Sequence, residues 1–169
     1  MRLFVAVWPS PEVVASLRAL PRPEVPRLRW TNEDQWHVTL RFLGDADEGE
    51  ATAALRRLRF GSRPVAEAGP AVGRFGNTVL YVPVAGLDEL AAAAVAATAD
   101  VGEPSAQGRP FRGHLTVGRA NQGRAPLRRL AEVPVAGRWE VDEVTLVASR
   151  LHPHGARYSV VARVPLPTV

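Results

Sequence analysis

Short apolar runs and helically spaced apolar positions follow one another along the whole chain. Residues 2–8 are apolar on both sides of an extended backbone, which is typical of a central strand. Ser10, Pro11 and Glu12 then form a helix start, and apolar residues follow at helical spacing to residue 20. The same criteria predict strands at 28–30, 36–43, 65–75, 78–84, 113–119, 133–137, 141–149 and 157–165, and helices at 45–60, 87–101 and 126–132.

The order of these elements indicates the fold class. Hairpin-like strand pairs are mixed among the helices, and Gly76 and Asn77 form the expected turn of one hairpin. This order favours an α+β fold with mostly antiparallel sheets over a doubly wound parallel sheet. Neither a G-x-G-x-x-G nor a Walker sequence follows a predicted strand, so chemistry on nucleoside triphosphates lacks its usual signature.

Composition narrows the class of protein further. The 169 residues are 46% hydrophobic and 22% charged, as expected of one globular domain. The longest small-apolar run, 90–99, is about half of the ~20 residues that cross a bilayer, and no signal peptide is visible, so we expect a cytoplasmic protein with no membrane partner. The absence of cysteine excludes disulfides, zinc thiolate sites and thiol nucleophiles.

The charge permits an anionic partner without requiring one. All 21 basic residues are arginine, and the formal net charge is only +4. Because almost nothing titrates between neutrality and the arginine pKa above ~12, this small excess gives a sequence pI near 10.8. Arginine without lysine is also what the coding bias of a GC-rich genome produces.

One pattern, His-apolar-Thr-apolar, occurs twice on predicted strands, at 37–40 and at 114–117. Residues two apart on a strand project from the same face, so each copy holds an imidazole beside a hydroxyl while the alternate residues face the core. In-line displacement at phosphorus needs a base beside the attacking water, an acid beside the leaving oxygen, and donors for the other oxygens. His37, Thr39, His114 and Thr116 supply these groups, and His titrates near neutral pH.

The sequence resembles the 2H phosphoesterases, and within them the RNA 2′,3′-cyclic phosphodiesterases formerly called 2′-5′ RNA ligases. RLFVAV at 2–7, WHVTLRFLG at 36–44 and PFRGHLTVGR at 110–119 carry the resemblance, together with Ser149, Arg150, Leu151 and Tyr158 near the end. Gly113 departs from the proline that is frequent in the family, and Gly118 from its usual alanine.

The resemblance implies one bilobal domain over 1–169, with two pseudo-symmetric lobes of mostly antiparallel sheet and flanking helices around a central cleft. It implies an enzyme that hydrolyses a terminal RNA 2′,3′-cyclic phosphate to a 2′-phosphate, with no metal or other cofactor. His37 would be the acid and His114 the base. RNA 3′ ends or small cyclic nucleotides would be the partners, no protein partner is implied, and a monomer is expected.

Three residues beside the motifs are candidates for substrate binding. The resemblance gives Arg119 a phosphate-binding role. Strict alternation aims Arg119 away from His114, so either a bulge begins at Gly118 or the strand ends there. By alternation, Arg41 shares the face of His37 and Thr39, so it would either reach the substrate's phosphate anion or only line the rim of the site. Phe42 has the opposite parity, which predicts core packing or stacking on a nucleobase.

Other assignments stay open. His152 and His154 flank a proline near a predicted turn, but no neighbouring Asp, Glu or Cys completes a metal site, so a loop role is favoured. The same cleft would suit a non-catalytic RNA-binding module, or an enzyme acting on another cyclic or 2′-5′ phosphodiester. Reverse 2′-5′ ligation shares the transition state of the hydrolysis.

Overall fold

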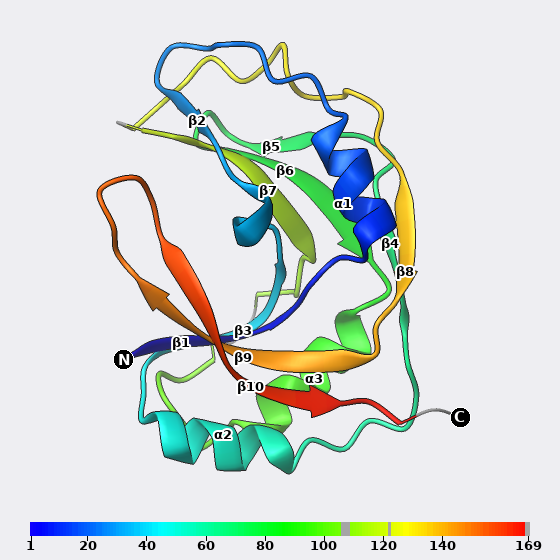
Figure 1. Ribbon diagram of the computed structural model, residues 1–169, viewed down its shortest axis with the longest axis vertical. Coiled ribbons are helices and arrows are strands. Elements are labelled where there is room, and N and C mark those ends of the chain that lie inside the picture. The colour runs from blue at the N-terminus through cyan, green and yellow to red at the C-terminus, as the bar shows by residue number, and fades with distance from the viewer. Residues whose placement is uncertain (106–108, 122, 168–169) are drawn as a thin grey trace.

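The computed structural model describes residues 1–105, 109–121 and 123–167, and it contains two antiparallel sheets. Figure 1 shows one sheet above the other. The first sheet has the spatial order β10 (Arg157–Pro165), β9 (Glu143–Arg150), β1 (Arg2–Val7), β3 (Val38–Asp45). The second has the order β2 (Leu28–Trp30), β7 (His114–Ala120), β6 (Val79–Ala85), β4 (Val65–Ala68), β8 (Gly137–Glu140), and β5 (Gly73–Phe75) pairs with β6. The α+β prediction is confirmed.

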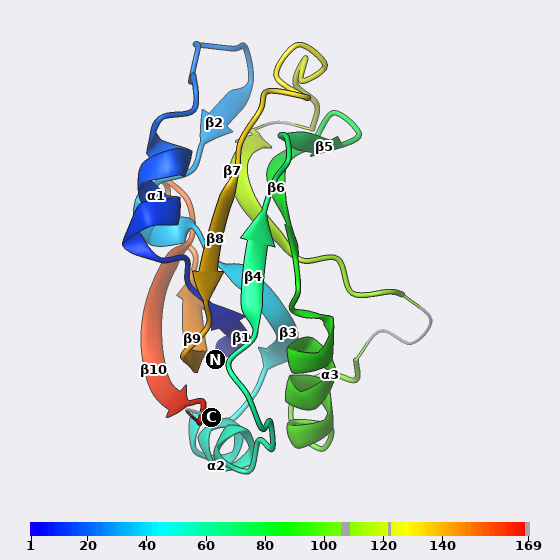
Figure 2. The ribbon, with the colours of Figure 1, turned by 90° about the vertical axis from the view of Figure 1, so that its right-hand side faces the viewer.

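Within the described residues, three α-helices pack against the two sheets. They are α1 (Pro11–Arg18), α2 (Glu48–Arg56) and α3 (Asp88–Ala97), and a 3-10 turn spans Glu33–Gln35. In α1, the Ser10 hydroxyl accepts from the backbone N–H of Val13, as the predicted helix start requires. Helices α2 and α3 lie beneath the first sheet, and α1 lies beside β8 (Figures 1 and 2). None of the described helices is both long enough and apolar enough to cross a bilayer.

The two faces of β1 have different surroundings. Leu3, Val5 and Val7 belong to the main core, which also includes buried residues of all three helices. Phe4 and Ala6 point the other way and form a small second cluster with Val147, against which Trp8 and Tyr158 pack. This second face carries the aromatic surroundings of the first motif.

Several element boundaries differ from the prediction. The single strand at 65–75 is divided into β4 and β5, because Gly69 has a φ of +111° and lies against the carbonyl of Val135. The predicted helix at 126–132 is wrong: residues 128–132 form turns, and Glu132 has a φ of +69°. The strand at 133–137 is reduced to an isolated bridge between Ala71 and Pro134, and β8 begins only at Gly137.

Candidate active site

The first motif lies at the start of β3, with His37 immediately before the strand, and the second motif lies on β7. These two strands belong to different sheets and contact each other. A short hydrogen-bonded chain joins them. The indole N–H of Trp36 donates to the Thr31 hydroxyl (3.0 Å), and that hydroxyl donates to the carbonyl of Thr116 (2.8 Å). Because Trp36 precedes His37 and Thr116 belongs to the second motif, this link fixes the two motifs relative to each other.

His37 lies among aromatic rings. Phe4 stacks on it (centroids 4.8 Å apart), Tyr158 meets it edge-on (5.0 Å) and Trp8 is tilted against it (5.4 Å). Its Nδ1 is 2.8 Å from the carbonyl oxygen of Gln35, so Nδ1 carries a hydrogen. In neutral His37, Nε2 is then the nitrogen that can accept a hydrogen bond, and it lies 3.1 Å from the Thr39 hydroxyl.

Burial lowers the pKa of His37 to about 4. The hydrogen bond to the Gln35 carbonyl opposes this shift, because it favours the charged form. The positive charges of Arg119 and His114 lower this pKa further. Free His37 is therefore neutral at pH 7, and both groups whose positive charge disfavours its imidazolium, Arg119 and His114, lie on β7.

His114 repeats the backbone contact of His37 in a different setting. Its Nδ1 is 2.7 Å from the carbonyl oxygen of Arg112, two residues earlier, as Gln35 is two residues before His37. Phe75 and Tyr81 meet the ring edge-on at 5.3 and 5.7 Å. In both motifs the repeated contact occupies Nδ1 and leaves Nε2 without a backbone partner.

A bulge follows the threonine of each motif. In β7, Tyr81 pairs with Thr116 and Leu80 pairs with Gly118, so Val117 is the extra residue. This bulge restores Arg119 to the face of His114 and Thr116, within a strand that continues to Ala120. Of the two alternatives for Arg119, the structure therefore has the bulge, one residue earlier than expected.

The equivalent bulge in β3 changes the expected positions of Arg41 and Phe42. Ala6 pairs with Thr39 and Val5 pairs with Arg41, which leaves Leu40 as the extra residue. Phe42 pairs with Phe4 and so lies on the face of His37, 43% exposed. The alternation prediction was wrong for both residues, because it did not include the bulge.

Arg41 faces the opposite side and is only 4% exposed. Its guanidinium donates to the carbonyls of Phe42, Val101 and Glu103 at 2.9, 3.3 and 2.8 Å. These contacts tie β3 to the chain that follows α3. They use the donors that an anion would need, so Arg41 does not belong to the phosphate-binding group.

A cavity of about 300 Å³ opens beside the motifs. His37, Thr116 and Arg119 line it, together with Arg29 and Tyr158. The sequence indicated Tyr158 only through the family resemblance, and it did not single out Arg29. Arg29 lies on a strand of only three residues, two positions before Thr31. So short a strand does not show from sequence which face Arg29 occupies; its pairing with β7 does.

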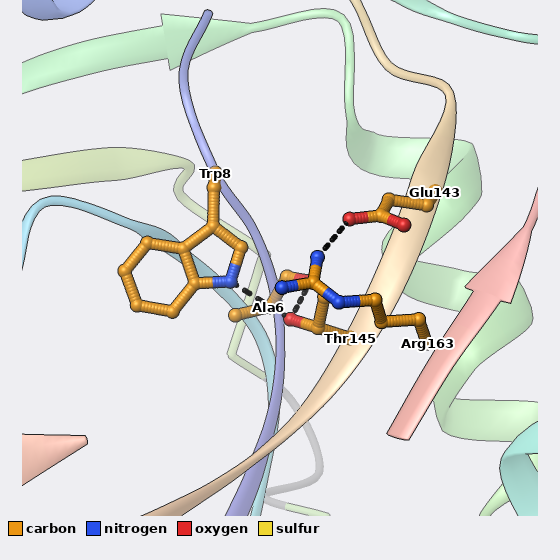
Figure 3. Close-up of polar contacts among 5 residues, drawn as sticks. All are labelled: Ala6, Trp8, Glu143, Thr145 and Arg163. Atoms are coloured by element: carbon orange, nitrogen blue, oxygen red, sulfur yellow. Dashed lines mark hydrogen bonds and ion pairs between the residues drawn. The ribbon is translucent and has the colours of Figure 1, made fainter. Parts of the chain in front are cut away.

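Trp8 is held in place by a buried threonine (Figure 3). Its indole N–H donates to the Thr145 hydroxyl (2.9 Å), which donates to the carbonyl of Ala6 (3.0 Å). Nearby, an ion pair between Arg163 and Glu143 joins β10 to β9. The bonds through Thr145 fix Trp8, one of the rings around His37, from a strand that does not carry a motif.

His152 and His154 lie on the loop between β9 and β10, with ring centroids 5.8 Å apart. His152 lines the rim of the cavity. Among the residues that the structure describes, no three His, Cys, Asp or Glu side chains are grouped to hold a metal ion.

Comparison with known proteins identifies the family. Residues 6–153 match the model of the 2′-5′ RNA ligase superfamily, a group of 2H phosphoesterases. The chain belongs to this superfamily. It is 30% identical over 155 residues to an RNA 2′,3′-cyclic phosphodiesterase of Geobacillus stearothermophilus. That match covers 84% of this chain and 49% of the relative, so the chain spans about half the relative's length.

Solved structures agree with this assignment. The crystal structure of TT0787 of Thermus thermophilus superimposes with a TM-score of 0.83 at 28% identity, covering 99% of both chains. The structure of E. coli LigT complexed with 3′-AMP gives a TM-score of 0.73 at 25% identity, covering 98% of this chain and 97% of that one. The bilobal α+β architecture is thus that of the superfamily.

Proposed function

We propose that the protein is a phosphodiesterase that opens a terminal 2′,3′-cyclic phosphate on RNA to a 2′-phosphate, without a metal ion. The observation that carries this proposal is the placement of the two imidazoles. In each, Nδ1 contacts a carbonyl and Nε2 is left for chemistry, and Arg119 lies on the face of β7 that carries His114 and Thr116. The relative from Geobacillus supports the choice of substrate.

The reaction is an in-line displacement at phosphorus. Nε2 of His114 takes a proton from water, and the water oxygen forms the new bond to phosphorus. The bond from phosphorus to the 3′ oxygen breaks, and that oxygen takes the proton from Nε2 of His37. The product carries a 2′-phosphate and a 3′-hydroxyl, and the transferred protons balance.

Arg119, Thr39 and Thr116 would contact the phosphoryl oxygens that neither attack nor leave. Arginine offers a planar pair of donors that matches two oxygens of a phosphate. Because this interaction exists in the ground state and strengthens as charge develops, it contributes to both binding and turnover.

The lowered pKa of His37 couples its protonation to substrate binding. A phosphodiester anion held by Arg119 offsets the Arg119 charge that disfavours a charged His37, so the bound substrate favours the imidazolium that the leaving oxygen needs. In the free protein, the limb of the kcat/KM profile that belongs to His37 therefore lies near pH 4.

The deciding experiment is hydrolysis of nucleoside 2′,3′-cyclic phosphates in excess EDTA, with the product's phosphate position determined by NMR. We expect a 2′-phosphate product and the same rate with and without EDTA, since Arg119 and the two imidazoles stabilise the charge on the phosphate in place of a metal ion. Binding without turnover would instead indicate an RNA-binding module. Loss of activity that a divalent ion restores would contradict the metal-independent mechanism.

A further inference from the structure

Two arginines stand side by side on adjacent strands at the cleft. In the register of β2 and β7, Arg29 is the direct partner of Arg119, so both side chains leave the same face of the sheet. Both are exposed, and both line the cavity that contains His37 and Thr116. Like charges placed directly opposite each other destabilise a sheet, and an anion between them offsets that cost.

Neither arginine has an acidic partner within 1–105, 109–121 and 123–167. Other arginines of the described chain are paired: Arg18 with Glu33, Arg63 with Glu140 and Arg163 with Glu143. The two cations of the cleft are thus free to meet a negatively charged ligand.

Arg29 reaches from the edge of the second sheet toward the first. Its strand, β2, is the outermost strand of its sheet, next to β7. A Cβ built on Gly155, in the loop between β9 and β10, would lie 3.2 Å from the Arg29 guanidinium, so the two groups are in contact. Arg29 therefore extends across the cavity, one strand farther out than Arg119.

We propose that Arg29, together with Arg119, forms a subsite for the phosphate on the 5′ oxygen of the reacting nucleotide. This inference rests on the proposed function. A phosphate at the reacting centre lies against β7, and the next phosphate of a nucleotide strand then lies outward over β2. The substrate class is accordingly the 3′ end of a nucleotide strand rather than a nucleoside cyclic phosphate.

Three substrates test the subsite: a nucleoside 2′,3′-cyclic phosphate, the same compound with a 5′-phosphate, and a dinucleotide ending in the cyclic phosphate. We expect kcat/KM of the native protein to be about tenfold higher for the two substrates with a second phosphate. Arg29→Gln should reduce that ratio to about one. Arg56→Gln, the same change on the distant helix α2, should leave the ratio intact.

Equal kcat/KM for all three substrates, or a ratio that survives Arg29→Gln, would overturn the subsite. A preference for the dinucleotide alone would assign the effect to the extra nucleoside and would also overturn it. If no substrate is hydrolysed, the proposed function fails instead. Calorimetric affinities for a nucleoside 2′-phosphate and its 2′,5′-bisphosphate then decide the subsite, with about tenfold tighter binding of the bisphosphate expected only when Arg29 is present.

Discussion

The two His-apolar-Thr-apolar motifs have nearly the same backbone but different surroundings. In each, Nδ1 meets the carbonyl two residues earlier and a bulge follows the threonine. Around His37, however, three aromatic rings close the space, whereas His114 meets two ring edges. Five residues after each histidine, the first motif has Phe42 and the second has Arg119.

This comparison separates what a repeated strand provides from what its neighbours provide. The repeated backbone sets the tautomer and the direction of each imidazole. The neighbours set the charge: burial and the nearby cations keep His37 neutral in the free protein. The two imidazoles of one repeated motif thus have different surroundings, and in the proposed mechanism His37 becomes the acid once the substrate anion offsets the charge of Arg119.

The largest expected effect tests the two roles directly. His37→Ala and His114→Ala should each lower kcat about 1000-fold, since each removes one proton transfer. On a phosphodiester with an aryl leaving group, which needs no protonation, the His37 variant should recover most of its activity. The His114 variant should not, because the attacking water still needs a base.

Leaving-group series for both variants provide the measurement. Recovery of the His114 variant alone would reverse the acid and base assignments. If neither substitution reduced turnover, the two-histidine mechanism would be wrong.

Substitutions at the two equivalent positions five residues after each histidine, Arg119 and Phe42, test the next largest effect on kcat/KM. Arg119→Ala should lower kcat/KM about 100-fold, through both KM and kcat, since a charged donor meets the phosphate in the ground state and the transition state. Phe42→Ala is the matched control, and we expect it to change kcat/KM by less than about tenfold. Steady-state kinetics that give the two variants similar losses would remove the distinction between these positions.

Sequence patterns predicted the motifs and the fold class, and they offered a bulge at Gly118 as one of two alternatives in β7, but they did not predict the bulge in β3. The strands that carry His37 and His114 are evident from apolar runs, and periodicity of two places each histidine beside its threonine. A one-residue bulge depends on pairing with a neighbouring strand, so the chain alone does not show it. That is why Arg41 and Phe42 exchanged their predicted faces.

Residues contributed by partner strands were also missed. Arg29 is placed at the site by its pairing with Arg119. Trp8 is held beside His37 by its bond to Thr145, more than a hundred residues away in the chain. The false helix at 126–132 shows the converse problem. Its residues favour a helix, but the backbone reverses at Glu132, whose N–H bonds to the carbonyl of Val72.

The lowered pKa of His37 should also appear in stability. The unfolded chain binds this proton near the reference pKa of 6.5, whereas the folded protein binds it only near 4. The contribution of His37 to the free energy of unfolding is therefore complete above about pH 6.5 and is lost as the pH falls toward about 4. We expect a loss of roughly 2 kcal/mol across that window.

Denaturant unfolding at several pH values measures this loss. The His37→Gln variant should lack it, while His154→Gln, a change on the exposed loop after β9, should retain it. The same pH dependence in all three proteins would assign the effect to other groups.

The smallest expected effect comes from opening the surroundings of His37 until they resemble those of His114. Tyr158 is the ring to remove, because it meets His37 edge-on from β10 and is itself buried enough for its own pKa to be raised. Tyr158→Ala admits water to the imidazole and should raise the His37 pKa by about one unit, since hydration favours the charged form. Tyr81→Ala, which removes the corresponding ring beside His114, should leave the His37 pKa unchanged. An NMR titration of the His37 ring proton distinguishes these outcomes: equal shifts in the two variants would mean that the aromatic surroundings do not make the two motifs different.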